Sequence, residues 1–346
     1  MLSEEEKLYF SRQIVLPNFG ESGQEKLKQS KILIVGIGGL GTFSSLLLAE
    51  MGVGYLRIVD RDLIEKTNLH RTPLYTEEDL NQAKVEVAAR HLKRLNPSMV
   101  VDTHACHINS GNIAELLESI DLVIDGLDNF ETRRVINREC VKKGVPFVFC
   151  GVSGRIGNIA IFNSTDKAPC LACLYHEVND DDLEGCDITG IHPALLAVIT
   201  GLQVHEAINF HLHKDTALVN SLLFVDLQNL SFNMIPIQKS NNCKVCSSSE
   251  NFQVEKPKTE YSSVELCGSN SFMIVPERKQ DIRLEQVLEK ILHEFKLVKQ
   301  GKLAFTFSYS GDTTISVFQG GNVLIRGLET KEQALKIWEK IKNKYL

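Results

Sequence analysis

Two cysteine pairs with the same spacing are the first residues whose types could do chemistry. Two residues separate Cys170 from Cys173, and the same spacing separates Cys243 from Cys246. Each pair can present two thiolates from one tight turn, and two pairs complete a closed tetrahedral zinc site with no position left for water. Two redox dithiols and free surface thiols are the alternatives, but neither pair follows a thioredoxin-like pattern. The spacing therefore predicts a structural Zn²⁺ ion that joins late segments of one domain.

A glycine-rich loop is the second feature that could do chemistry. Residues 36–41 read Gly-Ile-Gly-Gly-Leu-Gly, between an apolar run and a helical pattern, and Asp60 ends the next apolar run. Glycines let the backbone approach a phosphate at a helix N-terminus, and a carboxylate there can accept hydrogen bonds from a ribose. The loop therefore predicts a nucleotide site, which NAD or ATP could fill. The glycines expected to bind the nucleotide are Gly36, Gly38, Gly39 and Gly41.

Charged residues behind neighbouring strands could bind the phosphates of ATP. The chain has no Walker-type Gly-x-x-x-x-Gly-Lys-Ser/Thr loop, so these cations must come from elsewhere. Arg71 and Lys84 follow the strand that ends in Asp60, and Asp128 follows a later apolar run. Arg and Lys can neutralise a triphosphate, and an Asp at the carboxyl end of a strand can hold Mg²⁺. Each residue alone is more often a solvated surface charge, but their joint placement favours a functional site.

The elements that must position these residues alternate between strands and helices. Nearly continuous apolar runs followed by helical patterns are typical of a parallel sheet with crossover helices. A mostly buried helix is predicted over 193–212, with Pro193 near its first turn. The fold class predicted is α/β, with a Rossmann-like, mostly parallel sheet. The expected strands are 31–35, 55–59, 122–124 and 145–150.

The length of 346 residues predicts more than one domain. Residues 1–248 are expected to form the nucleotide-binding domain with the zinc site, and the polar stretch 249–268 a linker. Residues 269–346 show a strand, a helix, a hairpin and a final helix, which predicts a small α+β module. The module could dock a partner or only add stability, and the sequence favours neither.

Composition excludes several classes of protein. The chain is 43% hydrophobic and 24% charged, which is ordinary for a soluble globular protein, and no apolar run nears the ~18 residues needed to cross a bilayer. A net charge of −6 argues against general nucleic-acid binding. The acidic, polar start predicts no signal peptide, so the nine cysteines are expected to be reduced in a cytoplasmic protein.

The motifs, taken in order, resemble the ThiF/MoeB/HesA family, which are adenylyltransferases similar to ubiquitin-activating enzymes. The resemblance runs from about residue 8 to about residue 246 and keeps motif order and spacing. It departs from the family at His70 and Thr72, which flank Arg71 where Gln-Arg-Gln is usual, and at Leu127, where Thr is usual. Neither departure removes a charged group. The matching motifs are Arg12-Gln13, Gly23-Gln24-Glu25-Lys26-Leu27, Val35 to Gly41, Val59-Asp60, Asn68-Leu69-x-Arg71, Lys84 and Asp128-Asn129.

The resemblance implies a homodimer that uses ATP and Mg²⁺ to adenylate the C-terminal Gly-Gly of a small β-grasp sulfur carrier. The carrier would be MoaD-like or ThiS-like and would serve molybdopterin or thiamine thiazole synthesis. By motif position, Asp60 would hold the ribose, Arg71 and Lys84 the phosphates, and Asp128 the Mg²⁺. Asn68 would lie beside the phosphates, and Arg12 would reach them from the partner subunit.

Cys186 is a candidate catalytic residue. It lies in a polar, glycine-containing loop ahead of the predicted buried helix, where a thiol is accessible. Such a cysteine is more often incidental, and the acidic run around it would raise its thiol pKa. The resemblance strengthens the case, because some members form a thioester, persulfide or acyl-disulfide with the carrier at this position, although in others this cysteine is dispensable.

Three other functions fit parts of the pattern. The glycine loop alone permits an NAD-dependent oxidoreductase, but that reaction offers no joint role for Arg12, Arg71 and Lys84. A ubiquitin-like-modifier activating enzyme would form a thioester at Cys186. A zinc-stapled scaffold without activity is the third, and the retained charged residues argue against it.

Overall fold

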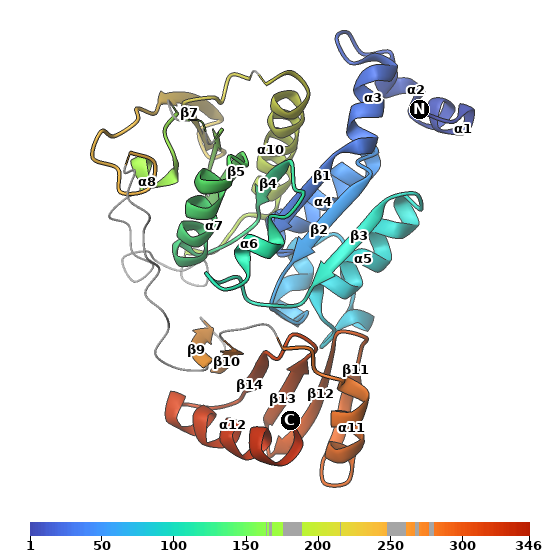
Figure 1. Ribbon diagram of the computed structural model, residues 1–346, viewed down its shortest axis with the longest axis vertical. Coiled ribbons are helices and arrows are strands. Elements are labelled where there is room, and N and C mark those ends of the chain that lie inside the picture. Colours follow the sequence, from blue (N-terminus) through green and yellow to red (C-terminus); the bar gives the residue numbers. More distant parts are fainter. Residues whose placement is uncertain are drawn as a thin grey trace.

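The computed structural model describes residues 1–163, 165, 168–175, 189–214, 216–247, 261–266, 270–276 and 280–346. Two sheets organise them, one of eight strands and one of six (Figure 1). The strand order of the large sheet is β3-β2-β1-β4-β5-β6-β7-β8. Its strands are β1 (Lys31–Val35), β2 (Tyr55–Val59), β3 (Val100–His104), β4 (Leu122–Asp125), β5 (Phe147–Ser153), β6 (Ile156–Phe162), β7 (Ser221–Asp226) and β8 (Ser231–Pro236).

The large sheet is parallel from β3 to β5 and antiparallel from β5 to β8. Its central strands β1 and β4 are apolar apart from Lys31 at the start of β1 and Asp125 at the end of β4, because both faces of the sheet are buried. In β1, Ile32 and Ile34 point into one core and Leu33 and Val35 into another. The predicted α/β fold with a mostly parallel sheet is therefore confirmed.

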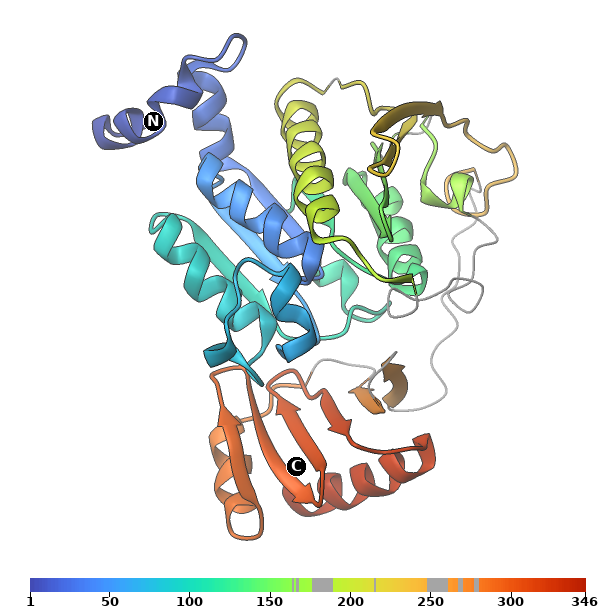
Figure 2. The ribbon, with the colours of Figure 1, turned by 180° about the vertical axis from the view of Figure 1, so that it is seen from behind.

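Helices cover both faces of the large sheet. One face carries α4 (Gly39–Met51), α5 (Lys84–Leu95) and α10 (Pro193–His213), as seen from behind in Figure 2. The other face carries α6 (Ile113–Leu116) and α7 (Phe130–Lys143). The shorter helices are α1 (Glu4–Tyr9), α2 (Ser11–Ile14), α3 (Gly20–Gln29), η1 (Lys66–Arg71), η2 (Glu77–Asp79) and α8 (Leu171–Leu174). Among the described helices, none is long and apolar enough to cross a membrane.

The second sheet belongs to the C-terminal part of the chain, which lies below the large sheet in Figure 1. Its strand order is β11-β12-β13-β14-β10-β9, and all pairs are antiparallel. Helices α11 (Leu284–Leu292) and α12 (Lys331–Tyr345) pack on one face through apolar side chains that include Leu288 and Trp338. The strands are β9 (Tyr261–Leu266), β10 (Ser271–Pro276), β11 (Lys296–Gln300), β12 (Ala304–Ser310), β13 (Thr313–Phe318) and β14 (Val323–Arg326).

The linker predicted over 249–268 is wrong for residues 261–266, because these form β9 and pair with β10 along its whole length. The strand was missed because its sequence, Tyr-Ser-Ser-Val-Glu-Leu, is polar. A strand at the edge of a sheet needs apolar residues on one face only. Residues 261–346 are called the C-terminal module from here on.

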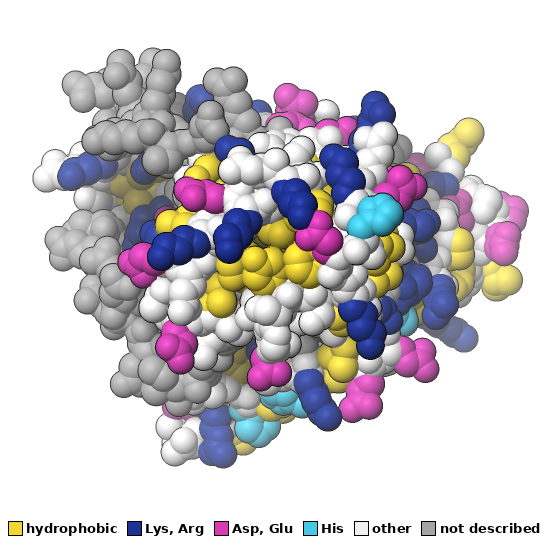
Figure 3. Space-filling model, turned by 90° about the horizontal axis from the view of Figure 1, so that it is seen from below, with side chains coloured by type: hydrophobic (Ala, Val, Ile, Leu, Met, Phe, Trp, Pro, Cys, Tyr) yellow, Lys and Arg dark blue, Asp and Glu magenta, His cyan; other side chains and the backbone are white. Residues whose placement is uncertain are grey.

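The outer surface of the C-terminal module is mixed in character. Seen from below in Figure 3, apolar side chains lie between many lysine and arginine side chains. Helix α12 contributes exposed lysines to the module, among them Lys331, Lys336 and Lys340. The opposite face of the module packs against the large domain.

Candidate nucleotide-binding and metal sites

One cavity lies at the carboxyl ends of the parallel strands, where a ligand of a doubly wound sheet is expected. It brings together segments that follow β1, β2, β3 and β4. Predicted site residues that line it are Gly36, Gly38, Gly39, Asp60, Asn68, Arg71, Lys84 and Asp128. Gly41 and Arg12 do not line it. Cys186 lies outside the described residues, so its covalent role stays a prediction.

The glycine loop brings the start of α4 close to the strand ends. Gly36 has a φ of +82°, and a Cβ there would lie 2.6 Å from the carbonyl oxygen of Gly126. A Cβ on Gly41 would lie 1.9 Å from the carbonyl oxygen of Gly36, so this glycine allows close packing. The N-cap of α4 is Gly38, which has no side chain to bind the first amides of the helix. Those amides can therefore bind an anion in the cavity.

Two backbone amides fix the carboxylate of Asp60. Its Oδ2 accepts a hydrogen bond of 2.7 Å from the amide of Ile37, and its Oδ1 accepts one of 2.8 Å from the amide of Asp62. Burial raises the pKa of Asp60, and the nearby ammonium group of Lys84 opposes that rise. The carboxylate is therefore oriented at the end of β2, where a ribose hydroxyl could be bound.

Lys84 begins α5 and forms an ion pair with Asp62, with 2.9 Å between Nζ and Oδ2. Burial lowers the pKa of Lys84, but the carboxylates of Asp62 and Asp60 outweigh burial and raise it above its usual value. The ammonium group therefore stays charged in a buried place, as a phosphate ligand requires. Asp62 was given no role from the sequence, because in the sequence an acidic residue that forms an ion pair cannot be distinguished from one that is solvated.

Asn68 and Arg71 come from η1, which follows Glu65. The side-chain Oδ1 of Asn68 accepts a hydrogen bond of 3.0 Å from the amide of Glu65, and its carbonyl accepts one of 2.9 Å from Thr72 Oγ1. Nη1 of Arg71 donates to the carbonyl of Thr67. The backbone of η1 thus directs a charged guanidinium and an amide toward the same cavity.

A buried ion pair orders the loop that carries Asp128. Nε of Arg133 lies 2.8 Å from Oδ2 of Asp125, and its Nη2 donates to the carbonyls of Leu127 at 2.6 Å and Cys150 at 2.8 Å. Gln203 on α10 donates to the carbonyl of Asp125 at 2.8 Å. These contacts hold the turn after β4, so the exposed carboxylate of Asp128 faces the cavity, where it could bind Mg²⁺.

Arg61 and His107 form a further pair in the wall of the cavity, with 2.9 Å between Nη1 and Nδ1. Burial, reinforced by the charge of Arg61, lowers the pKa of His107 to about 3. The imidazole is therefore neutral. Sequence reasoning missed this pair because the strand before it, β3, was itself not predicted.

Arg12 lies on α2 and outside the cavity of its own chain. Figure 1 shows α1 and α2 at the end of the molecule away from the C-terminal module. Exposed apolar side chains surround Arg12 in sequence, namely Leu8, Tyr9, Val15 and Leu16. The role predicted for Arg12 therefore requires a second subunit.

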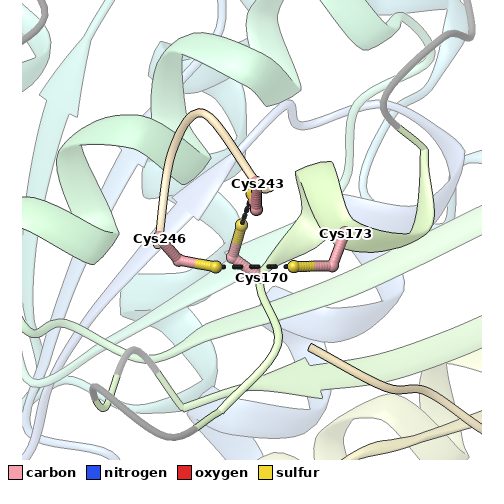
Figure 4. Close-up of side chains that lie close together, drawn as sticks. All are labelled: Cys170, Cys173, Cys243 and Cys246. Carbon is pink, nitrogen blue, oxygen red and sulfur yellow. Dashed lines mark hydrogen bonds between the residues drawn. The ribbon is translucent and has the colours of Figure 1, made fainter. Parts of the chain in front are cut away.

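The four cysteines of the predicted zinc site lie together (Figure 4). Their sulfur atoms are all within 4.8 Å of one another, with 3.7 Å between Cys170 and Cys243 and 3.4 Å between Cys173 and Cys246. A tetrahedron with Zn–S bonds of ~2.3 Å has S–S edges of about 3.8 Å, so these side chains fit a zinc ion. Nδ2 of Asn137 on α7 lies 3.6 Å from the sulfur of Cys170. The chemistry and spacing of the donors match a closed structural site.

Comparison with known proteins points in the same direction. Residues 10–245 match the model described as ThiF family. The sulfur carrier protein adenylyltransferase of Thermus thermophilus is 34% identical over 70% of this chain and 92% of that protein. The molybdopterin-synthase adenylyltransferase of Escherichia coli is 34% identical over 71% of this chain and 98% of that protein.

A longer relative and a solved structure each match 71% of this chain. The adenylyltransferase and sulfurtransferase MOCS3 of Culex quinquefasciatus is 37% identical over 71% of this chain, which spans only 56% of that relative's length. A crystal structure of E. coli MccB with MccA-N7isoASN shares the fold, with a TM-score of 0.62 and 24% identity over 71% of this chain and 76% of that one.

Proposed function

Because the chain belongs to the ThiF family, we propose that it is an adenylyltransferase that transfers AMP from ATP to the C-terminal carboxylate of a small sulfur-carrier protein. The single observation behind this proposal is the cavity that joins the free N-terminus of α4 to Asp60, Arg71, Lys84 and Asp128. Two relatives named for this activity match 70% and 71% of this chain. The carrier would end in Gly-Gly, be MoaD-like or ThiS-like, and serve molybdopterin or thiamine thiazole synthesis.

The residues of the cavity would act by positioning and by neutralising charge. The carrier's carboxylate oxygen attacks the α-phosphorus of ATP, the bond between that phosphorus and the bridging oxygen breaks, and pyrophosphate leaves with the electron pair. Lys84 and Arg71 would neutralise the charge that develops on the phosphates. Asp128 would hold Mg²⁺, which supplies further positive charge to the same oxygens. No general base is required, because the attacking carboxylate is already ionised.

The proposed function predicts exchange of labelled pyrophosphate into ATP that depends on the carrier. We expect exchange with a carrier ending in Gly-Gly and none with the same carrier shortened by these two residues, because the attacking carboxylate must reach the α-phosphate. Pyrophosphate exchange measured over a series of MoaD-like and ThiS-like carriers checks this. No exchange with any of them, together with thermal stabilisation by NAD and not by ATP, would favour an oxidoreductase instead.

We further propose that the enzyme is a homodimer in which Arg12 completes the site of the partner subunit. This role fits the place of Arg12 outside its own cavity and the exposed apolar side chains near it. The arginine would then act on the phosphates of the neighbouring subunit.

Mixing two inactive variants tests this arrangement. Arg12→Ala and Lys84→Ala should each be inactive alone, because each removes a phosphate contact from every site. If subunits exchange freely, an equal mixture should recover about a quarter of the wild-type exchange rate, since half of the dimers then hold one intact site. Pyrophosphate exchange before and after mixing measures the recovery. A mixture that stays inactive although mass spectrometry shows mixed dimers would refute the role of Arg12.

A further inference from the structure

The C-terminal module contacts the segments that carry the candidate nucleotide ligands. Arg326, at the end of β14, forms an ion pair with Glu65, with 2.9 Å between Nη2 and Oε1. Its Nη1 donates to Oδ1 of Asn81 at 3.3 Å. The side chains of Arg326 and Glu65 are 16% and 38% exposed, so this ion pair is shielded from water on the arginine side.

The two residues that Arg326 contacts lie on opposite sides of a short ladder. The amide of Asn81 donates to the carbonyl of Ile64, the amide of Ile64 donates to Gln82, and the amide of Lys84 donates to Asp62. Segments 62–65 and 81–84 are therefore joined by hydrogen bonds. Arg326 holds the outer end of this ladder, and the ion pair between Asp62 and Lys84 lies at its inner end.

Glu65 also connects the ladder to η1. Its amide donates to the side chain of Asn68, and its carbonyl accepts from the amide of Asn68 at 2.9 Å. Asn68 and Arg71 both line the cavity. A shift of Glu65 would therefore move two candidate phosphate ligands together with the ladder.

A second contact fixes the first turn of α5, which begins at Lys84. The carboxylate of Glu86 accepts hydrogen bonds from the amides of Lys302 at 2.9 Å and Leu303 at 3.1 Å. These amides belong to the turn between β11 and β12. The module thus contacts α5, the helix that carries Lys84, and this contact lies on the side of the helix that faces away from the cavity.

The module is packed firmly enough to act as a support. Met273, Val275, Phe318 and Leu324 on its inner face are buried in the same apolar core as the helices of the nucleotide-binding domain. Burial raises the pKa of Asp62, the charges of Lys84 and Arg61 outweigh burial and lower that pKa, and the charge of Arg326 adds a smaller lowering effect. Packing and charge therefore both link the module to the Lys84 pair.

We propose that the C-terminal module braces the nucleotide site and that Arg326 is a positioning residue for Asn68, Arg71 and Lys84. The inference rests on the proposed adenylation activity. It assigns the module a role in the reaction of its own chain, distinct from docking a partner or only adding stability. Arg326 itself touches no substrate and acts through Glu65 and Asn81.

The test compares variants of both members of the ion pair with a matched control. Arg326→Ala and Glu65→Gln should each lower kcat/KM for ATP in pyrophosphate exchange by about tenfold, because displaced ligands align poorly with the phosphates. Arg283→Ala removes an exposed arginine of the same module and should stay within about twofold of wild type. Melting temperatures of all variants show whether each one is folded.

Combined variants separate positioning from a general loss of structure. The double variant Arg326→Ala with Glu65→Gln should be no slower than the slower single variant, because both remove the same contact. The charge swap Arg326→Glu with Glu65→Arg should recover part of the loss. Losses that multiply in the double variant, or single variants that fold and keep wild-type kinetics, would overturn the proposal.

Measurements on the same variants distinguish a failure of this proposal from a failure of the proposed adenylation activity. If the wild type shows no exchange with any carrier, the adenylation activity fails, and binding of ATP by calorimetry still tests the brace. Arg326→Ala and Glu65→Gln should then bind ATP about tenfold more weakly than the wild type and Arg283→Ala. Equal affinities across the set would refute the brace. If Arg326→Ala does not fold, Glu65→Gln carries the test, since its side chain is partly exposed.

Discussion

Replacing Lys84 with methionine is expected to lower the rate constant of pyrophosphate exchange by about 10²–10³-fold. Lys84 is the buried cation at the start of α5, and its ammonium group is held by Asp62 at 2.9 Å. Methionine has a similar length but no charge, so the phosphates would lose a preorganised contact in a place shielded from water. Steady-state exchange at saturating ATP and carrier measures the change.

Lys93→Met is the matched control for this variant. Lys93 lies on the same helix, but it is exposed near the opposite end and far from the cavity lining. We expect its exchange rate to stay within about twofold of wild type. If the two variants lose activity equally, or if Lys84→Met keeps its rate, Lys84 does not stabilise the reacting phosphates.

The same variant should also show a pH-dependent loss of stability. Without the ammonium group, the carboxylates of Asp60 and Asp62 remain close together and only partly exposed to water, so their pKa values in the folded protein should rise above those in the unfolded chain. Such groups favour folding at low pH and lose that contribution as the pH rises through the folded-state pKa. The melting temperature of Lys84→Met should therefore fall furthest below wild type at neutral pH and approach it in acid.

Local patterns in the sequence predicted those residues of the site that directly follow neighbouring parallel strands. Gly36, Asp60 and Asp128 each follow a buried parallel strand, and the carboxyl ends of such strands meet at one edge. That rule is enough to place them in one cavity. Gly41 was predicted from the glycine loop and does not line the cavity; its lack of a side chain allows α4 to approach Gly36, and its role in nucleotide binding stays a prediction.

Contacts between distant segments could not be predicted in this way. Arg133 lies inside a charged helix and resembles a surface residue, yet it is 4% exposed and paired with Asp125. Arg326 contacts Asn81 across 245 positions of the chain, and no periodicity connects them. Such pairs are chosen by three-dimensional packing. For the same reason the antiparallel strands β6 to β8 and the edge strands β3 and β11 were not expected, whereas β9 was missed because its sequence is polar.

For the zinc site, the spacing of the cysteines in the sequence was enough to predict all four ligands. A tetrahedral site needs four donors, and a Cys-x-x-Cys pair supplies two of them from one turn whatever the rest of the fold does. The only long-range condition is that the two pairs meet. Sequence cannot show that meeting, and the structure does, with 3.4 Å between Cys173 and Cys246.

Removing the zinc ligands is expected to have the largest effect on stability. We propose that the purified protein contains one zinc ion per chain, and that Cys243→Ser lowers the zinc content and reduces the melting temperature by about 10 °C or more. A serine hydroxyl is a poor ligand, and the remaining thiolates would repel one another in a buried cluster. Elemental analysis and thermal unfolding measure the two effects.

The control variant Cys140→Ala distinguishes the effect of losing the metal ion from the effect of losing a buried side chain. Cys140 is buried on α7 and outside the four-cysteine cluster, so its loss should cost only about 1–2 kcal/mol and leave one zinc ion per chain. Because a closed site offers no position for substrate, Cys243→Ser should keep most of its exchange rate per folded molecule at low temperature. Asn137 connects Cys170 to α7, which begins two residues after Asp128, so any remaining loss should appear in the response to Mg²⁺ concentration. Zinc-free protein with an unchanged melting temperature would refute a structural role for this site.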